Sequence, residues 1–230
     1  MSIDEISKRK GHKDFVTVVC DIDRGDLVEV IDSHKQDKII EVLEQQPLEM
    51  RKQVKEVSVD MWGGFPKVIE KVFPNAVVVI DRFHVMKAVN SNLNTIRKQS
   101  GIKVKNNKFI LLKNGIDLSD EENEKLELIL KQSERLRTAY ELKESFRAIY
   151  ESNLTFEEGK TKIESWIDKA RKIYGSAIPT ITNHVEGICN YFLNRTTSGV
   201  MEGLNNKSKL IKRRAYGFLN FDNFRMRLLA

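Results

Sequence analysis

The sequence lacks the features that mark several common classes of protein. It has two cysteines in 230 residues, and their wide separation matches neither a zinc-binding spacing nor a disulfide framework, so Cys20 and Cys189 are expected to be buried small residues. No apolar run approaches the roughly 20 residues needed to cross a bilayer. Residues 1–15 include acids and no apolar stretch, so they do not resemble a secretory signal. These absences favour a cytoplasmic protein with no membrane partner.

What is present is the composition of a globular protein that is richer than average in charge. Hydrophobic residues make up 40% of the chain and charged residues 31%, and the length allows one core with a sizeable insertion. The formal net charge is +6. Residues 207–227 contain seven Lys or Arg residues and one acid, whereas residues 119–158 are rich in glutamate. This separation of charge predicts a surface that faces DNA.

The first part of the chain alternates between strand and helix patterns. Two β-branched runs flank a turn that contains Gly25, which predicts a β-hairpin. A helical period follows, and Pro47 is expected to divide it. The apolar run at residues 76–80 predicts a strand that is buried on both faces in the middle of a sheet. The expected strands are residues 2–6, 15–22, 27–31, 54–59 and 76–80, and the expected helices are residues 37–54, 62–72 and 85–97.

Beyond residue 100 the pattern is helical. Ser119 and Glu122 have the spacing of a capping box, as do Thr155 and Glu158. In this motif a hydroxyl and a carboxylate satisfy the free N–H groups at a helix start. A last long helix is expected over residues 199–211, followed by a bend marked by Gly217 and a short terminal helix.

Several carboxylates lie at the ends of the expected strands, where folds with a mixed sheet place their sites. Asp4 lies on or just after the first strand, and Asp60 lies at the end of the fourth. Carboxylate oxygens are the hard ligands that Mg²⁺ requires for phosphoryl transfer. Other acids share such positions, and for any one of them a turn cap or a solvated group is the commoner role. These other acids are Glu5, Asp21, Asp23, Asp32 and Asp81.

Three long blocks of sequence distinguish among these acids by resemblance. They read SIDEISKRKGHKDFVTVVCDIDRG, VSVDMWGGFPKVIEKVFPNAVVVIDRFHVMKAVN and RTTSGVMEGLNNKSKLIKRRAYGFLNFDNFRMRLL. In this order they resemble the catalytic domain of insertion-sequence transposases of the ISL-three family. The resemblance runs from Ser2 to the last residue, although the middle of the chain is less distinctive. These enzymes are DDE transposases.

The resemblance implies a fold of the α/β class. The expected architecture is a ribonuclease-H-like mixed sheet flanked by helices, with an all-α insertion before the final catalytic helix. The expected order of strands and helices agrees with it. Residues 1–100 would form the first part of the catalytic core, residues 101–185 the helical insertion, and residues 186–230 the C-terminal helices and the basic tail.

The resemblance also implies the catalytic residues. Asp4 in IDE and Asp60 in VSVDMW match the two aspartates of the triad, and Glu202 in MEGLNN matches the glutamate. All three would be catalytic and would hold Mg²⁺, for which Mn²⁺ is expected to substitute. The resemblance implies two Mg²⁺ ions: one would activate a water molecule, and later a freed 3′ hydroxyl, and the other would stabilise the leaving oxygen.

Basic residues near the end of the chain are expected to contact DNA. Lys209 follows Glu202 with the Glu-six-Lys spacing of related transposases, in which the lysine is thought to contact a phosphate; the alternative is a solvated helix charge. Arg195 precedes the last long helix and is expected to bind phosphate or to form a surface salt bridge. The full expected set is Lys209, Lys212, Arg213, Arg214 and Arg195.

Further residues have two interpretations each. Asp81 and His84 in DRFH resemble an Asp-two-His element of this and related families, so they are expected either to support the site or to be structural. Trp62 is expected to belong to the core, with stacking on a flipped base as the alternative. The aromatic residues of the tail suit base stacking, but most of them are expected to dock the terminal helix on the core. They are Tyr216, Phe218, Phe221 and Phe224.

The resemblance therefore implies a transposase that cleaves DNA and transfers strands at insertion-sequence ends. Its partners would be double-stranded DNA, as transposon ends and target, and further copies of itself on that DNA. It would be a bacterial protein associated with the nucleoid when bound. Family members normally carry an N-terminal zinc-binding and helix-turn-helix region, which is not seen here, so a fragment or a truncated gene product is expected. The alternatives are a truncated DNA-binding remnant that does not transpose, or a plain ribonuclease-H-like nuclease.

Overall fold

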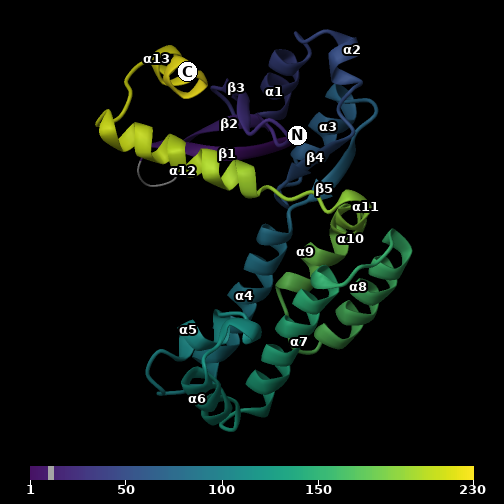
Figure 1. Ribbon diagram of the computed structural model, residues 1–230, viewed down its shortest axis with the longest axis vertical. Coiled ribbons are helices and arrows are strands. Elements are labelled where there is room, and N and C mark those ends of the chain that lie inside the picture. Colours follow the sequence, from purple (N-terminus) through teal and green to yellow (C-terminus); the bar gives the residue numbers. More distant parts are fainter. Residues whose placement is uncertain (10–12) are drawn as a thin grey trace. The chain divides into compact units, whose positions relative to one another are not determined.

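A computed structural model of the chain describes residues 1–9 and 13–230, which divide into two compact units. The core unit consists of Met1–Asp81 and Asn194–Ala230, and the helical unit consists of Arg82–Leu193 (Figure 1). The boundaries expected from the sequence, at residues 100/101 and 185/186, differ from these. They differ because the helices just inside each of the observed boundaries pack on other helices of the helical unit.

The core unit is built on a five-stranded mixed sheet with the order β3-β2-β1-β4-β5. β1 pairs antiparallel with β2, as β2 does with β3, whereas β1–β4 and β4–β5 are parallel. This arrangement is compatible with a ribonuclease-H-like fold. The strands are β1 (Ser2–Arg9), β2 (Lys13–Asp21), β3 (Asp26–Ile31), β4 (Glu56–Val59) and β5 (Val77–Ile80).

The predicted hairpin is confirmed, and its turn has a clear local cause. Gly25 adopts φ +77°, a left-handed conformation that glycine adopts without a steric penalty. The Asp21 side chain accepts hydrogen bonds from the N–H groups of Asp23 at 2.9 Å and Arg24 at 3.2 Å. An aspartate that binds the backbone two residues on stabilises a turn, so the local sequence is sufficient to form it.

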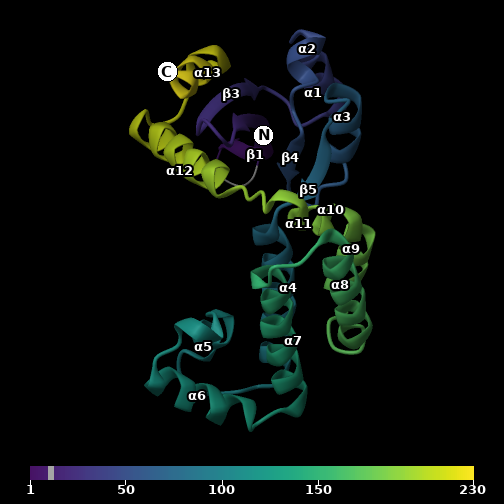
Figure 2. The same cartoon turned by 45° about the vertical axis from the view of Figure 1, so that its right-hand side comes forward.

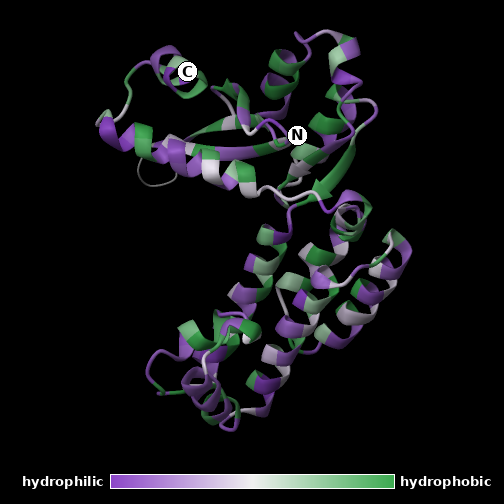
Figure 3. Cartoon of the chain, in the orientation of Figure 1, coloured by the Kyte–Doolittle hydropathy of each residue, from purple (hydrophilic) through white to green (hydrophobic). Residues whose placement is uncertain are grey.

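The position predicted for residues 76–80 is wrong. These residues do form a strand, β5, but it lies at the edge of the sheet and pairs only with β4 among the described residues. Its apolar run, visible in Figure 3, is buried at Val79 and Ile80, whereas Val77 is 38% exposed. An apolar strand can thus lie at the edge of a sheet when helices cover part of it. The apolar run indicates that the strand is buried but does not indicate its position in the sheet.

Helices cover both faces of the sheet in the core unit, as Figure 2 shows. α12 and α13 pack on one face, where Met201, Phe224 and Leu228 meet Val16 and Val18 of β2 in a buried cluster. α1 and α3 pack together on the other side, and Pro47 separates α1 from α2 as predicted. The helices of the unit are α1 (Gln36–Leu43), α2 (Leu48–Arg51), α3 (Phe65–Val72), α12 (Gly199–Arg214) and α13 (Phe221–Leu229).

Trp62 lies just before α3, and its half-buried ring packs against the start of that helix. The ring centroid is 4.8 Å from that of Phe65 in an edge-to-face contact. A Cβ atom on Gly64 would lie 2.2 Å from Cη2 of Trp62, so a larger residue there would force the indole to move. These contacts favour the core interpretation of Trp62 over base stacking.

The helical unit contains no strand, and all its residues lie within the described part of the chain. Both predicted capping boxes are confirmed at the starts of α6 and α8. No described helix combines the length and the apolar character that a membrane span requires. The helices are α4 (Arg82–Gln99), α5 (Asn107–Leu112), η1 (Gly115–Asp117), α6 (Asp120–Leu130), α7 (Glu134–Glu151), α8 (Phe156–Ala170), α9 (Ala177–Asn183), α10 (Val185–Cys189) and α11 (Tyr191–Asn194).

Aromatic rings form the centre of the helical unit. Phe146 of α7 contacts Trp166 of α8, with ring centroids 4.3 Å apart, and Trp166 stacks on Tyr174 at 5.9 Å. The Trp166 indole N–H donates to the Leu142 carbonyl at 2.8 Å, so its polar end is also satisfied. Aromatic pairs of this kind stabilise a core beyond the area that they bury.

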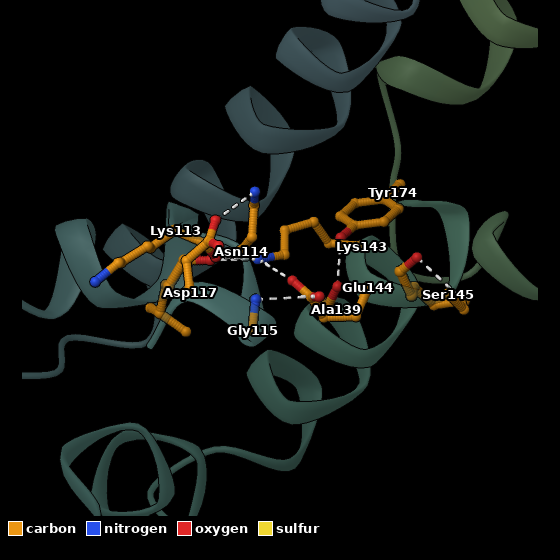
Figure 4. A network of polar contacts seen from close by, with 11 residues as sticks. Lys113, Asn114, Gly115, Asp117, Ala139, Lys143, Glu144, Ser145 and Tyr174 are labelled. Carbon is orange, nitrogen blue, oxygen red and sulfur yellow. Dashed lines mark hydrogen bonds and ion pairs between the residues drawn. The ribbon is translucent and has the colours of Figure 1, made fainter. Parts of the chain in front are cut away.

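A buried lysine fastens the segment between α5 and α6 to α7 (Figure 4). The Lys143 side chain is fully buried, and its ammonium donates to the carbonyls of Leu111 at 3.1 Å and Lys113 at 2.7 Å. It also forms an ion pair with Glu144, whose other oxygen accepts from Gly115 N at 3.3 Å. Burial lowers the pKa of Lys143, while the Glu144 carboxylate opposes that shift. The buried Lys143 ammonium and the neighbouring Glu144 carboxylate therefore hold this segment against α7.

Substitution of Lys143 tests this role. Lys143→Met should lower the free energy of unfolding by about 2–4 kcal/mol, because two buried carbonyls and a carboxylate lose their donor. Hydrogen exchange should increase most in residues 111–118. Lys131→Met, at an exposed position of the same unit, is the control and should change neither quantity. Equal stability of the two variants would show that Lys143 does not hold this segment.

Candidate functional site

The pairing of β1 with β4 brings two of the predicted catalytic acids together. Ser2 of β1 pairs with Ser58 of β4 in parallel register. The same register, continued by two residues, sets Asp4 beside Asp60, which directly follows β4. Neighbouring strands lie about 4.8 Å apart, and residues in one row point to the same face of the sheet. Asp4 and Asp60 therefore share one face at the carboxyl end of β4.

A third aspartate continues this row on β5. Val59 pairs with Ile80, and the Asp81 N–H donates to the Val59 carbonyl at 2.8 Å, so Asp81 follows Asp60 in the row. Asp81 is 2% exposed. Its carboxylate accepts a short hydrogen bond from the hydroxyl of Ser198, the residue that precedes α12. Asp81 is thus a buried anchor for the start of α12.

α12 is fastened to this row at a second point. The Asn205 side-chain amide donates to Oδ2 of Asp4 at 2.6 Å. Ser198 and Asn205 are seven residues apart, or about two helical turns, so they lie on the same side of the helix. Glu202 lies between them, four residues after Ser198 and three before Asn205, and belongs to the same stripe. The N-terminal half of α12 therefore carries Glu202 along the aspartate row.

Glu202 itself remains exposed to solvent. Among the described residues, no three acidic, histidine or cysteine side chains are gathered closely enough to form a set of metal ligands. The structure thus brings Asp4 and Asp60 together on the sheet and presents Glu202 from the facing helix. It does not bring the three carboxylates into one cluster.

Negative charge in this region is incompletely offset. Burial, followed by the charges of Asp60 and Asp4, raises the pKa of Glu5 to about 7. Glu5 Oε1 is buried and has no hydrogen-bond partner among the described residues, and the same is true of Asn205 Oδ1. Asp4 and Asp60 supply neighbouring carboxylates of the kind that a small divalent cation prefers. Their oxygens also accept hydrogen bonds from Asn205, Glu5 N–H and Trp62 N–H, and a magnesium site would need Glu202 as a third ligand.

The basic residues of α12 differ in what they contact. Lys209, Arg213 and Arg214 are exposed, and Lys209 continues the stripe of Glu202. The Lys212 ammonium donates to the Ser7 carbonyl at 2.5 Å, and burial followed by the charge of Lys209 lowers its pKa. Lys212 therefore joins α12 to β1, whereas the other three present their charges to solvent.

Arg195 lies at the other end of β4. Its neighbours Asn194 and Thr196 both bind the Glu56 carboxylate, Asn194 at 2.6 Å. Glu56 is the first residue of β4, four residues before Asp60, which is about 13 Å along a strand. Arg195 has a left-handed backbone, with φ +56°. The structure therefore places Arg195 away from the aspartate row.

His84 belongs to a different unit from the other predicted site residues. It lies in the first turn of α4, in the helical unit, and its ring meets that of Phe83 edge to face at 5.4 Å. Asp81 is the last residue of the first segment of the core unit. The DRFH motif therefore spans the point where the chain passes from one unit to the other.

Comparison with known proteins assigns the family. Residues 1–228 match the family model of the ISL3 transposases, which is described as "Transposase". The chain belongs to the ISL3 transposase family. The matched range includes the first two blocks on which the resemblance was based and all but the last residue of the third.

Two curated transposases are similar to this ISL3 transposase chain. The transposase for insertion sequence element IS1557 of Mycobacterium tuberculosis is 26% identical over 253 residues, covering 95% of the chain and 56% of the relative. The transposase for insertion sequence element IS1001 of Bordetella parapertussis is 24% identical over 249 residues, covering 100% of the chain and 60% of the relative. The chain thus spans little more than half the length of these relatives.

Sequence patterns did not reveal the two anchors of α12 in this ISL3 transposase. Ser198 and Asn205 are neutral residues, and their partners Asp81 and Asp4 lie more than a hundred positions away in the chain. One local signal was available. Asn205 and Lys209 share a helical stripe with Glu202, so a polar residue on the expected catalytic face of the helix could have been singled out.

A second basic region was also missed, in the helical unit. Residues 82–116 contain eight Lys or Arg residues and no acid. Two hydrogen bonds order the loop before α5: Arg97 donates to Asn107 Oδ1 at 2.8 Å, and Asn107 donates to the Ile102 carbonyl at 2.8 Å. Around this loop four lysines are exposed and form no ion pair with described residues: Lys98, Lys103, Lys105 and Lys108.

Removal of the Asn205 amide tests the anchoring of α12. Asn205→Ala should lower the free energy of unfolding by about 1.5–3 kcal/mol, because a hydrogen bond to a charged group is lost in a buried setting. Urea denaturation measures the change. Asn206→Ala, at the exposed neighbouring position, is the matched control and should shift the midpoint little. Equal midpoints for the two variants would contradict the anchoring role.

Proposed function

We propose that the chain is the catalytic core of a DNA transposase of the DDE type, with a ribonuclease-H-like core and an all-α insertion. It would cleave DNA and transfer strands at the ends of an insertion sequence. The observation that carries this proposal is the fastening of α12 to the aspartate row by Ser198 and Asn205, with Glu202 between them. This geometry supports a shared role for Asp4, Asp60 and Glu202.

In this proposal the three carboxylates hold Mg²⁺, and Mn²⁺ can replace it. When bound, the metal lowers the pKa of an attacking water or hydroxyl and offsets charge on the leaving oxygen. Asp4 and Asp60 provide neighbouring ligands from a rigid sheet, and Glu202 provides a third from the facing helix. Asn205 orients the Asp4 carboxylate by donating to Oδ2, while Oδ1 accepts from the Glu5 N–H at 2.8 Å. Partners that hold a ligating carboxylate in this way fix its orientation, and the exposed Glu202 side chain would turn inward to complete the site.

The partner in this proposal is double-stranded DNA, as transposon ends and as target. Lys209, Arg213 and Arg214 are exposed along α12, the helix that carries Glu202, and form no ion pair with described residues. The basic loop of the helical unit provides a second surface for phosphates. Cutting and joining a pair of ends calls for more than one active site, so the chain would act as a homo-oligomer on DNA. In a bacterial cell this activity would place it at the nucleoid.

Neutral substitutions test the catalytic assignment. Asp4→Asn, Asp60→Asn and Glu202→Gln should each reduce metal-dependent cleavage of insertion-sequence end DNA by at least about a thousandfold, because each removes one charged metal ligand. Asp23→Asn, in the hairpin turn, is the control and should retain activity. Cleavage that survives in Asp60→Asn or Glu202→Gln would refute the assignment. DNA binding without cleavage by the unsubstituted protein would instead favour a remnant that no longer transposes.

Removal of charge from the helical unit tests the second DNA surface. The triple change of Lys103, Lys105 and Lys108 to Gln should weaken binding to a DNA duplex. It should also reduce the slope of log affinity against log salt by about 2.7, since each lost phosphate contact contributes about 0.9. The matched control neutralises three exposed lysines of the same unit, Lys162, Lys169 and Lys172, with the same change of charge. Identical slopes for both triple variants would exclude this surface.

A further inference from the structure

The C-terminus of α12 has an unusual residue at its capping position. The Gly217 N–H donates to the Lys212 carbonyl at 3.0 Å, and the Tyr216 N–H donates to the Arg213 carbonyl at 3.1 Å. This pair of bonds is the Schellman motif, whose left-handed residue is usually glycine. Here Tyr216 occupies that position, with φ +54°, and Gly217 follows with φ +99°. A bulky residue in this conformation is strained relative to glycine.

The side chain of Tyr216 is fully exposed, so packing within the fold does not offset this strain. Tyr216 is 101% exposed and Leu219 is 106% exposed. By contrast, Phe218 and Phe224 pack against each other at 5.1 Å, and Phe221 is partly buried beside the same cluster. The prediction that most of the tail aromatics dock the terminal helix is therefore confirmed by these three phenylalanines, and Tyr216 is the exception.

The surroundings of Tyr216 are positively charged. Arg213 and Arg214 directly precede the turn, are exposed, and form no ion pair with described residues. Cations in the last turn of a helix also offset the helix dipole, which accounts for part of their stability there. This interaction with the dipole does not explain why a tyrosine occupies position 216, where glycine would be less strained. Strain retained at an exposed position indicates a contact with a partner.

From these observations we propose that Tyr216 stacks on an unpaired nucleobase of DNA while Arg213 and Arg214 bind the adjoining phosphates. This inference rests on the proposed function, because it takes DNA as the partner. An exposed ring beside two guanidinium groups matches the two components of single-stranded DNA, a flat base and a charged backbone. Leu219, in the same turn, adds an apolar surface next to the stacked base.

The helix sets the distance between this contact and the candidate catalytic acids. Glu202 and Tyr216 are fourteen residues apart along and just beyond α12, which corresponds to about 20 Å. With about 3.4 Å for each base-pair step, the stacked base would lie about six steps from the bond that is cut. Tyr216 would therefore hold a base that is opened near the transposon end.

Binding measurements on two DNA probes test the inference. The probes are a short blunt duplex and the same duplex with an unpaired 3′ tail. The unsubstituted protein should bind the tailed probe more tightly by about 5- to 150-fold, the range expected for stacking of one base. Tyr216→Gly should abolish this preference, while Tyr216→Phe keeps it. Arg213→Gln should weaken binding to both probes and reduce the salt dependence.

Thermal unfolding provides a second readout that separates function from structure. Tyr216→Gly should raise the melting temperature or leave it unchanged, because glycine fits the left-handed position better. A lower melting temperature together with unchanged preference for the tailed probe would overturn the inference and make Tyr216 a structural residue. Dissociation of an oligomer by Tyr216→Gly, with DNA binding intact, would overturn it in favour of a contact between copies.

Failure of the inference and failure of the proposed function give different results. If the unsubstituted protein binds neither probe, DNA is not the partner, and both the proposed function and the role of Tyr216 are refuted. If it binds both probes equally, with affinity that depends on Arg213, the DNA partner stands and the stacking role of Tyr216 is refuted.

Discussion

The hydrogen bond from Asn205 to Asp4 is the contact on which the candidate site depends. At 2.6 Å it joins the middle of α12 to β1, and the bond from Ser198 to Asp81 fixes the helix start at the other side of the row. These two bonds flank Glu202, and the bond from Lys212 to the Ser7 carbonyl joins the C-terminal half of α12 to β1. Such polar contacts determine where Glu202 lies along the sheet, because the apolar contacts of α12 are not directional.

This arrangement leaves negative charge that the fold does not neutralise. Asp4, Asp60 and Asp81 occupy one row, and Glu5 lies close enough to Asp4 and Asp60 for their charges to raise its pKa. Like charges in a row destabilise the folded state unless a cation joins them. Within the core unit, exposed basic residues lie farther along α12 than Glu202, at Lys209, Arg213 and Arg214. One helix thus carries both a candidate metal ligand and cations that suit phosphates.

Local features of the fold could be predicted from the sequence, whereas long-range ones could not. The capping box of Ser119 and Glu122 and the break at Pro47 depend on neighbouring residues, so their patterns are visible in the chain. The edge position of β5 depends on strand order, which an apolar run does not report. The partners of Asn205 and Ser198 depend on tertiary packing. The acids of the candidate triad were chosen by family resemblance, and strand register then set Asp4 beside Asp60.

The most direct measurement of the central claim is a crystal structure of the chain with manganese, located by its anomalous scattering. The account predicts an ion between Asp4 and Asp60, at about 2.1–2.3 Å from their oxygens, with the Glu202 carboxylate turned inward to coordinate it. Manganese bound elsewhere, with Glu202 still turned to solvent and the aspartate row empty at saturating metal, would contradict it.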